Sequence, residues 1–137
     1  MPHNPTLTPS LGFLDLVALL RARAQSHGET GYLFLDAETE GPRLSYAALD
    51  RQAGALAARL VALGLAGERV LLVFPPGLDF IVGFFACLYA GAVAVPAYPP
   101  DPARLDRSAP RLRAIAADAG AKALLTTEAL AAFAELT

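Results

Sequence analysis

The feature that most constrains the fold is an alternation, from Val70 onward, of short apolar runs with longer segments of helical spacing. The apolar runs are expected to be strands, at residues 70–74, 92–95 and 121–126, and the first two are expected to be buried. Each run precedes an expected helix, at residues 78–90, 108–119 and 128–136. Strands that alternate with helices form a parallel sheet with right-handed crossovers. The sequence therefore predicts an α/β fold built on a parallel sheet with crossover helices.

The first part of the chain is expected to hold a helix and a short hairpin. Apolar residues recur at helical spacing from Phe13 to Ala24, which predicts an amphipathic helix that ends near Gly28. Ser10 is a possible N-cap for this helix. The short apolar segment 32–35 and a second short segment, 42–44, flank an acidic turn and predict the hairpin.

A second helix is expected directly after the hairpin, with Ser45 as its N-cap and Gly64 as its stop. Five apolar residues in this segment follow one another at steps of three and four: Leu49, Ala53, Leu56, Leu60 and Leu63. This spacing places them on one face of a helix. We expect that face to be buried.

The high apolar content of the chain fits either a membrane protein or a piece of a larger protein. Apolar residues other than glycine make up 55 % of the sequence, above the roughly 45–50 % that typical soluble domains reach with glycine included. The strongest candidate for a membrane span is Phe80 to Ala97, which has no charged side chain, but Gly83, Gly91 and Pro96 interrupt it. We interpret this stretch as a helix followed by a strand, and we expect no transmembrane segment.

The charge balance excludes some classes of partner. With 11 basic and 13 acidic residues, the formal net charge is −2, which provides no field for nucleic acid or anionic lipid. Cys87 is the single cysteine, and this fits a reducing compartment, so we expect a cytoplasmic protein. Residues 1–10 resemble a flexible leader, because they lack the basic and apolar regions of a signal peptide.

No residue of the chain carries a recognisable catalytic, cofactor-binding or metal-binding pattern, so no site residue is assigned. The turn 75–77 follows a strand and opens a helix, but its two prolines offer no N–H groups to a phosphate. His3 and His27 have no ligand partner at a useful spacing. Cys87 is expected to be a small buried hydrophobic residue.

A group of basic residues lies before and within the helix expected near residue 108. Arg104, Arg107 and Arg111 are spaced three and four residues apart, so they could present a stripe to a phosphate or an acidic partner. Acidic residues lie close by in the sequence: Asp101, Asp106 and Asp118. We favour a solvated helix face held by salt bridges. The proline-rich segment 98–102 is expected to be a rigid loop.

Two blocks of the sequence carry a resemblance to known proteins. The first is Leu44-Ser45-Tyr46-Ala47-Ala48-Leu49 with the apolar and glycine positions that follow it to Val70. The second is Leu88-Tyr89-Ala90-Gly91-Ala92-Val93-Ala94-Val95-Pro96. Both blocks resemble the adenylate-forming enzymes, the superfamily of acyl-CoA synthetases, peptide-synthetase adenylation domains and luciferases. Within the superfamily, Pro75-Pro76-Gly77-Leu78-Asp79-Phe80 and the segment Val95-Pro96-Ala97-Tyr98-Pro99-Pro100 resemble fatty acyl-AMP ligases.

This resemblance implies a function for a longer protein. Such ligases use ATP and Mg²⁺ to convert a fatty acid to acyl-AMP, and they transfer the acyl group to the phosphopantetheine arm of an acyl carrier protein in lipid, polyketide or peptide biosynthesis. Residues 11–137 would be the incomplete N-terminal portion of the large domain. The family's phosphate loop, magnesium ligand, ribose-binding aspartate and lysine would lie beyond Thr137. We therefore expect the 137-residue chain alone to be inactive and to bind no cofactor.

Two other interpretations stay open. The chain could be a noncatalytic α/β module that serves docking or dimerisation and keeps the scaffold of the family. It could also belong to an acyl-CoA synthetase.

Overall fold

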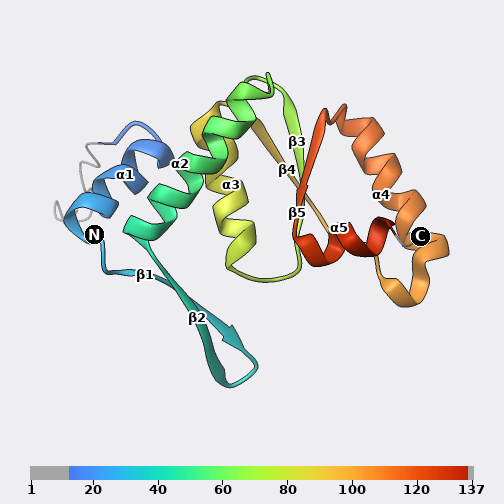
Figure 1. The fold of residues 1–137 in the computed structure, drawn as a ribbon, viewed down its shortest axis with the longest axis horizontal. Coiled ribbons are helices and arrows are strands. Elements are labelled where there is room, and N and C mark those ends of the chain that lie inside the picture. The colour runs from blue at the N-terminus through green and yellow to red at the C-terminus, as the bar shows by residue number, and fades with distance from the viewer. Residues whose placement is uncertain (1–12, 136–137) are drawn as a thin grey trace, which may run out of the picture.

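A computed structural model describes residues 13–135 and shows a layered α/β architecture preceded by a helix and a hairpin (Figure 1). The elements are α1 Leu16–Ser26, β1 Gly31–Asp36, β2 Thr39–Ser45, α2 Tyr46–Ala62, β3 Arg69–Val73, α3 Leu78–Ala90, β4 Val93–Ala97, the 3₁₀ helix η1 Pro102–Arg104, α4 Leu105–Ala119, β5 Ala123–Thr126 and α5 Glu128–Glu135. The predicted fold class is confirmed, including the helix and hairpin that precede the sheet.

The sheet of the α/β part has the strand order β4-β3-β5, and both pairings are parallel. Helices α2 and α3 lie on one side of it, and α4 and α5 lie on the other (Figure 1). Residues 70–73 of the central strand β3 are all buried, because helices cover both faces. This confirms that β3 is a strand buried on both sides. The expectation of a buried strand at 92–95 is wrong, because β4 lies at the edge of the sheet and its Val93 is 50 % exposed.

The hairpin of β1 and β2 is antiparallel and extends away from the helices (Figure 1). Its strands reach Asp36 and Thr39, so the turn is shorter than the acidic segment that we expected to form it. Ala37 turns the chain with a φ of 54°. This positive φ lets the two strands meet over a very short connection.

The first helix is capped by a residue other than the one expected. The carboxylate of Asp15 accepts a hydrogen bond from the amide of Ala18 at 2.8 Å, so Asp15 is the N-cap of α1. Ser10 lies outside the described residues. The predicted cap of α2 is confirmed, since the hydroxyl of Ser45 accepts from the amide of Ala48 at 3.1 Å.

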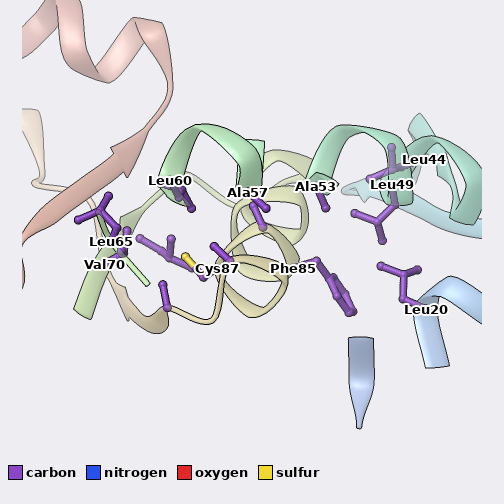
Figure 2. Close-up of a cluster of buried hydrophobic side chains, with 14 residues drawn as sticks. Leu20, Leu44, Leu49, Ala53, Ala57, Leu60, Leu65, Val70, Phe85 and Cys87 are labelled. Carbon is purple, nitrogen blue, oxygen red and sulfur yellow. The ribbon is translucent and has the colours of Figure 1, made fainter. Parts of the chain in front are cut away.

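The core lies between α2, α3 and the face of the sheet that they cover (Figure 2). The α2 residues buried there are Leu49, Ala53, Ala57 and Leu60. Leu63 was expected on this stripe, and that expectation is wrong because its side chain is 73 % exposed. Since α2 ends at Ala62, Leu63 lies past the last helical turn, where the chain leaves the core.

Cys87 lies inside the same core with none of its surface exposed. Burial raises the pKa of its thiol to about 11, because the apolar surroundings disfavour the charged thiolate. At neutral pH the residue is therefore a neutral thiol, which confirms its expected role as a small hydrophobic side chain.

Two element boundaries differ from the sequence-based expectation around the proline-rich loop. Strand β4 includes Pro96 and ends at Ala97, which an edge strand permits because one side of its backbone has no partner. Helix α4 begins at Leu105, before the expected start at 108. Asp101 accounts for the early start, because its carboxylate caps the 3₁₀ turn that leads into α4 and accepts from the amide of Ala103 at 2.9 Å.

The stretch Phe80 to Ala97 folds as most of α3 followed by β4, as predicted. Among the described residues, no helix combines the length and the apolar character needed to cross a membrane.

A contact between three helices ties α1 to the core. The hydroxyl of Tyr89 on α3 donates to the Asp50 carboxylate on α2 at 2.6 Å, and the Arg21 guanidinium carbon lies 4.8 Å from the centre of the Tyr89 ring. Burial and the hydrogen bond to Asp50 raise the pKa of Tyr89. The neutral hydroxyl is the form that donates to the carboxylate, so folding favours the protonated tyrosine.

Tyr89→Phe is therefore expected to lower the free energy of unfolding by about 1 kcal/mol at neutral pH, because a charged hydrogen bond is lost at a partly exposed position. The effect should depend on pH. Since the folded pKa is raised, the contribution is complete below about pH 10, the ordinary tyrosine pKa, and is lost as the pH rises toward the folded pKa. Urea midpoints of both proteins from pH 7 to above pH 10 give the measurement. A difference that stays constant over this range would contradict the assignment.

Candidate functional site

The carboxyl ends of the three parallel strands meet at one edge of the sheet, which is where open α/β sheets commonly bind ligands. Residues 74–77 follow β3, and residues 98–100 follow β4. Thr126 ends β5 and Thr127 leads into α5. This carboxyl edge is the candidate functional site of the described residues.

An apolar cleft of about 430 Å³ lies at this edge between the segments that follow β3 and β4. Its walls are Phe74, Pro75, Pro76, Gly77, Phe80, Pro96, Ala97, Tyr98 and Pro99. None of these residues has a charged side chain, and the prolines contribute no N–H donor. The cleft therefore suits an apolar ligand and offers little to a phosphate.

A second pocket, of about 520 Å³, lies between α2, α3 and the end of β5. Leu56, Phe74, Val82 and Gly83 form its apolar side. Its polar side is formed by Asp79, Thr126, Thr127 and Glu128. The hydroxyl oxygen of Thr126 is buried and has no hydrogen-bond partner among the described residues.

Two observations bear on a metal ion or a phosphate group at this edge. In residues 13–135 no group of three or more His, Cys, Asp or Glu side chains could hold a metal ion. The turn 75–77 opens helix α3 as predicted, and Asp79 in the first turn of that helix would repel an anion.

The histidines lie away from the carboxyl edge or outside the described residues. His27 follows the end of α1, where its Nδ1 lies 2.7 Å from the hydroxyl of Ser26. His3 lies outside the described residues. His27 is thus a helix-end residue with a local hydrogen bond.

The arginines near α4 are exposed, but the expected salt bridges are wrong. Arg104 stands at the N-cap position, and Arg107 and Arg111 lie on α4. In the part of the chain that the structure describes, the one ion pair within 4.0 Å joins Arg43 to Glu40 at 3.3 Å. Of the three expected acidic partners, Asp101 caps the 3₁₀ turn. The others, Asp106 and Asp118, lie exposed on α4.

The proline-rich segment is a loop between β4 and η1, as predicted. Tyr98 is 86 % exposed, whereas Pro99 and Pro100 are half-buried. The hydroxyl of Ser108 closes the loop by accepting from the amide of Asp101 at 3.0 Å. This bond fixes the entry into α4.

Comparison with known proteins identifies the family of this chain. A family model of AMP-binding enzymes matches residues 20–137, nearly the whole chain. The chain belongs to the AMP-binding enzyme family. Within the family it corresponds to the N-terminal part of the AMP-binding domain and is close to the fatty acyl-AMP ligases.

Two curated members of the AMP-binding family carry this likeness. JamA from Moorena producens, a medium-chain fatty acid ligase for acyl carrier protein, is 47 % identical over 116 residues, which cover 83 % of this chain and 20 % of JamA. The long-chain fatty acid AMP ligase FadD32 from Mycolicibacterium smegmatis is 36 % identical over 135 residues, which cover 91 % of this chain and 21 % of FadD32.

A solved structure supports the same placement. The fatty acyl-adenylate ligase of Legionella pneumophila, in complex with acyl adenylate and pyrophosphate, matches with a TM-score of 0.72 and 38 % identity. The match covers 82 % of this chain and 19 % of that one. This chain of the AMP-binding family thus spans about a fifth of the length of the relatives it matches.

Sequence reasoning did not single out Phe74 or Thr126, which line the carboxyl edge of this AMP-binding domain portion. The sequence feature that could have pointed to these two residues is their position, because each lies at the carboxyl end of a predicted parallel strand. Neither residue type is specific enough to mark a site without that geometry.

Proposed function

We propose that this chain is the N-terminal part of the large domain of a fatty acyl-AMP ligase, and that residues 1–10 are a leader to it. The longer enzyme joins a fatty acid to AMP with ATP and Mg²⁺, then transfers the acyl group to a carrier protein in the cytoplasm. The 47 % identity to JamA over most of the chain carries this proposal.

The chemistry of the carboxyl edge supports an acyl substrate. The cleft around Phe74, Phe80 and Pro99 has apolar and aromatic walls and no charged side chain, which suits the burial of an alkyl chain. The nucleotide and the metal belong to residues outside this chain. In the in-line attack of a carboxylate on a phosphate, those residues supply positioning and charge neutralisation.

The test uses the full-length ligase. We expect exchange of pyrophosphate into ATP only when a fatty acid is present, followed by acyl transfer to carrier-bound phosphopantetheine in preference to coenzyme A. The 137-residue chain alone serves as a matched control and is expected to give no exchange.

Each alternative predicts a different result. Efficient acyl transfer to coenzyme A would indicate an acyl-CoA synthetase. The absence of exchange with every fatty acid tried would favour a noncatalytic docking or dimerisation module.

A further inference from the structure

Phe74 is a wall that the apolar cleft and the second pocket share. It follows the central strand β3, with the apolar cleft on its β4 side and the second pocket on its β5 side. Both pockets include Phe74 in their lining. No other residue lines both of these cavities.

The ring of Phe74 is held from two directions. A Cβ atom added at Gly83 on α3 would lie 3.0 Å from the ring edge, so the absence of a side chain at Gly83 lets the ring pack against the helix. On the other side, the Phe80 ring meets Phe74 edge to face, with 6.5 Å between centroids. Phe80 in turn stacks on Phe84 at 6.2 Å. These contacts hold the Phe74 ring in place, so that it forms a partition between the apolar cleft and the second pocket.

The two pockets that this partition separates differ in chemistry. The cleft has no charged side chain, whereas the second pocket has the carboxylates of Asp79 and Glu128 and the unpaired hydroxyl of Thr126. The polar groups disfavour an alkyl chain only beyond the apolar side of the second pocket, which Leu56, Val82 and Gly83 form, because the chain would there bury them without hydrogen bonds.

We propose that Phe74 sets the upper limit on the length of the acyl chain by closing the apolar cleft against the second pocket. The inference rests on the proposed function, because it takes the ligand of the cleft to be the alkyl chain of a fatty acid. The carboxyl end of the acid lies toward the rest of the enzyme, and its methyl end contacts the Phe74 ring.

The experiment measures kcat/KM of the full-length ligase for a series of saturated fatty acids of increasing length, by pyrophosphate exchange. Phe74→Ala frees the space of the ring and opens the apolar side of the second pocket, which Leu56, Val82 and Gly83 form, so the optimum should move to longer acids. The kcat/KM ratio of a longer acid to the wild-type optimum should rise at least about ten-fold, since one methylene group in a tight pocket already changes discrimination by roughly that factor. Phe74→Leu retains part of the wall and should give a smaller shift in the same direction.

Phe84→Ala is the matched control. It removes an aromatic ring from the same cluster, but Phe84 lines neither pocket. We expect Phe84→Ala to lower the thermal midpoint without moving the length optimum. If Phe74→Ala does not fold, Phe74→Leu and Phe84→Ala carry the comparison.

The possible outcomes distinguish a failure of the inference about Phe74 from a failure of the proposed ligase function. An active wild-type enzyme whose length profile is the same in Phe74→Ala or Phe74→Leu would overturn the inference and leave the proposed function intact. A variant that adenylates every acid normally but fails in acyl transfer would also overturn it, because the cleft would then take the acceptor. A wild-type ligase that activates no fatty acid would overturn both.

Discussion

The 137-residue chain by itself is expected to self-associate at micromolar concentrations. In residues 13–135, β4 and β5 each pair with β3 alone, so the sheet has two free edges. Val93 on β4 is 50 % exposed, and Leu124 on β5 is 47 % exposed. A free strand edge with exposed apolar side chains is a template for pairing with another chain.

Light scattering coupled to size-exclusion chromatography measures this association over a range of concentrations. The variant Val93→Lys/Leu124→Lys adds a charge to each edge strand and should elute mainly as a monomer. Val61→Lys/Leu63→Lys is the control, because these residues of α2 and its C-cap are 53 % and 73 % exposed but lie on no strand. A wild-type chain that remains monomeric would contradict the expected self-association. If the control variant Val61→Lys/Leu63→Lys dissociates the chain equally, the association does not occur through the strand edges.

Leu72→Ala is expected to cost roughly 2–5 kcal/mol of unfolding free energy, the usual range for a large cavity in a core. Leu72 lies on the central strand with no exposed surface and belongs to the core beneath α2 and α3. Since small domains are stable by only about 5–15 kcal/mol, this one substitution removes a large part of the total.

The urea midpoint is the measurement, made in the Val93→Lys/Leu124→Lys background so that association does not obscure unfolding. Leu35→Ala is the control, because Leu35 is 59 % exposed on the hairpin and its truncation should change stability by about 0.5 kcal/mol or less. Equal midpoints for the two variants would mean that Leu72 is not packed as the structure shows.

Most of the fold could be predicted because hydrophobic spacing reports local structure directly. The bounds of α3, Leu78 and Ala90, coincide with the predicted ones, since Gly77 and Gly91 mark its two ends. Leu63 shows the limit of this reasoning. Its spacing continues the stripe of α2, but spacing does not reveal where the partner surface ends, and Leu63 is exposed.

The candidate site was less predictable, because it depends on contacts between distant segments. Phe74 and Thr126 meet at one pocket only because β3 and β5 are neighbours in the sheet. The expected salt bridges failed for a related reason: proximity in sequence placed Asp101 near the arginines, but its carboxylate instead caps the turn before α4.

The strand order β4-β3-β5 has a consequence for folding of the chain during its synthesis on the ribosome. The central strand β3 is synthesised before both of its neighbours, so each later strand adds to an edge that already exists and none must insert between two others. Strand β4 follows after a single helix, α3, and its pairing closes the shorter loop, which lowers the entropic cost. Strand β5 arrives after a second long helix, α4. During translation the β5 side of β3 is therefore uncovered the longest, and a chaperone that shields nascent chains would have most to protect there.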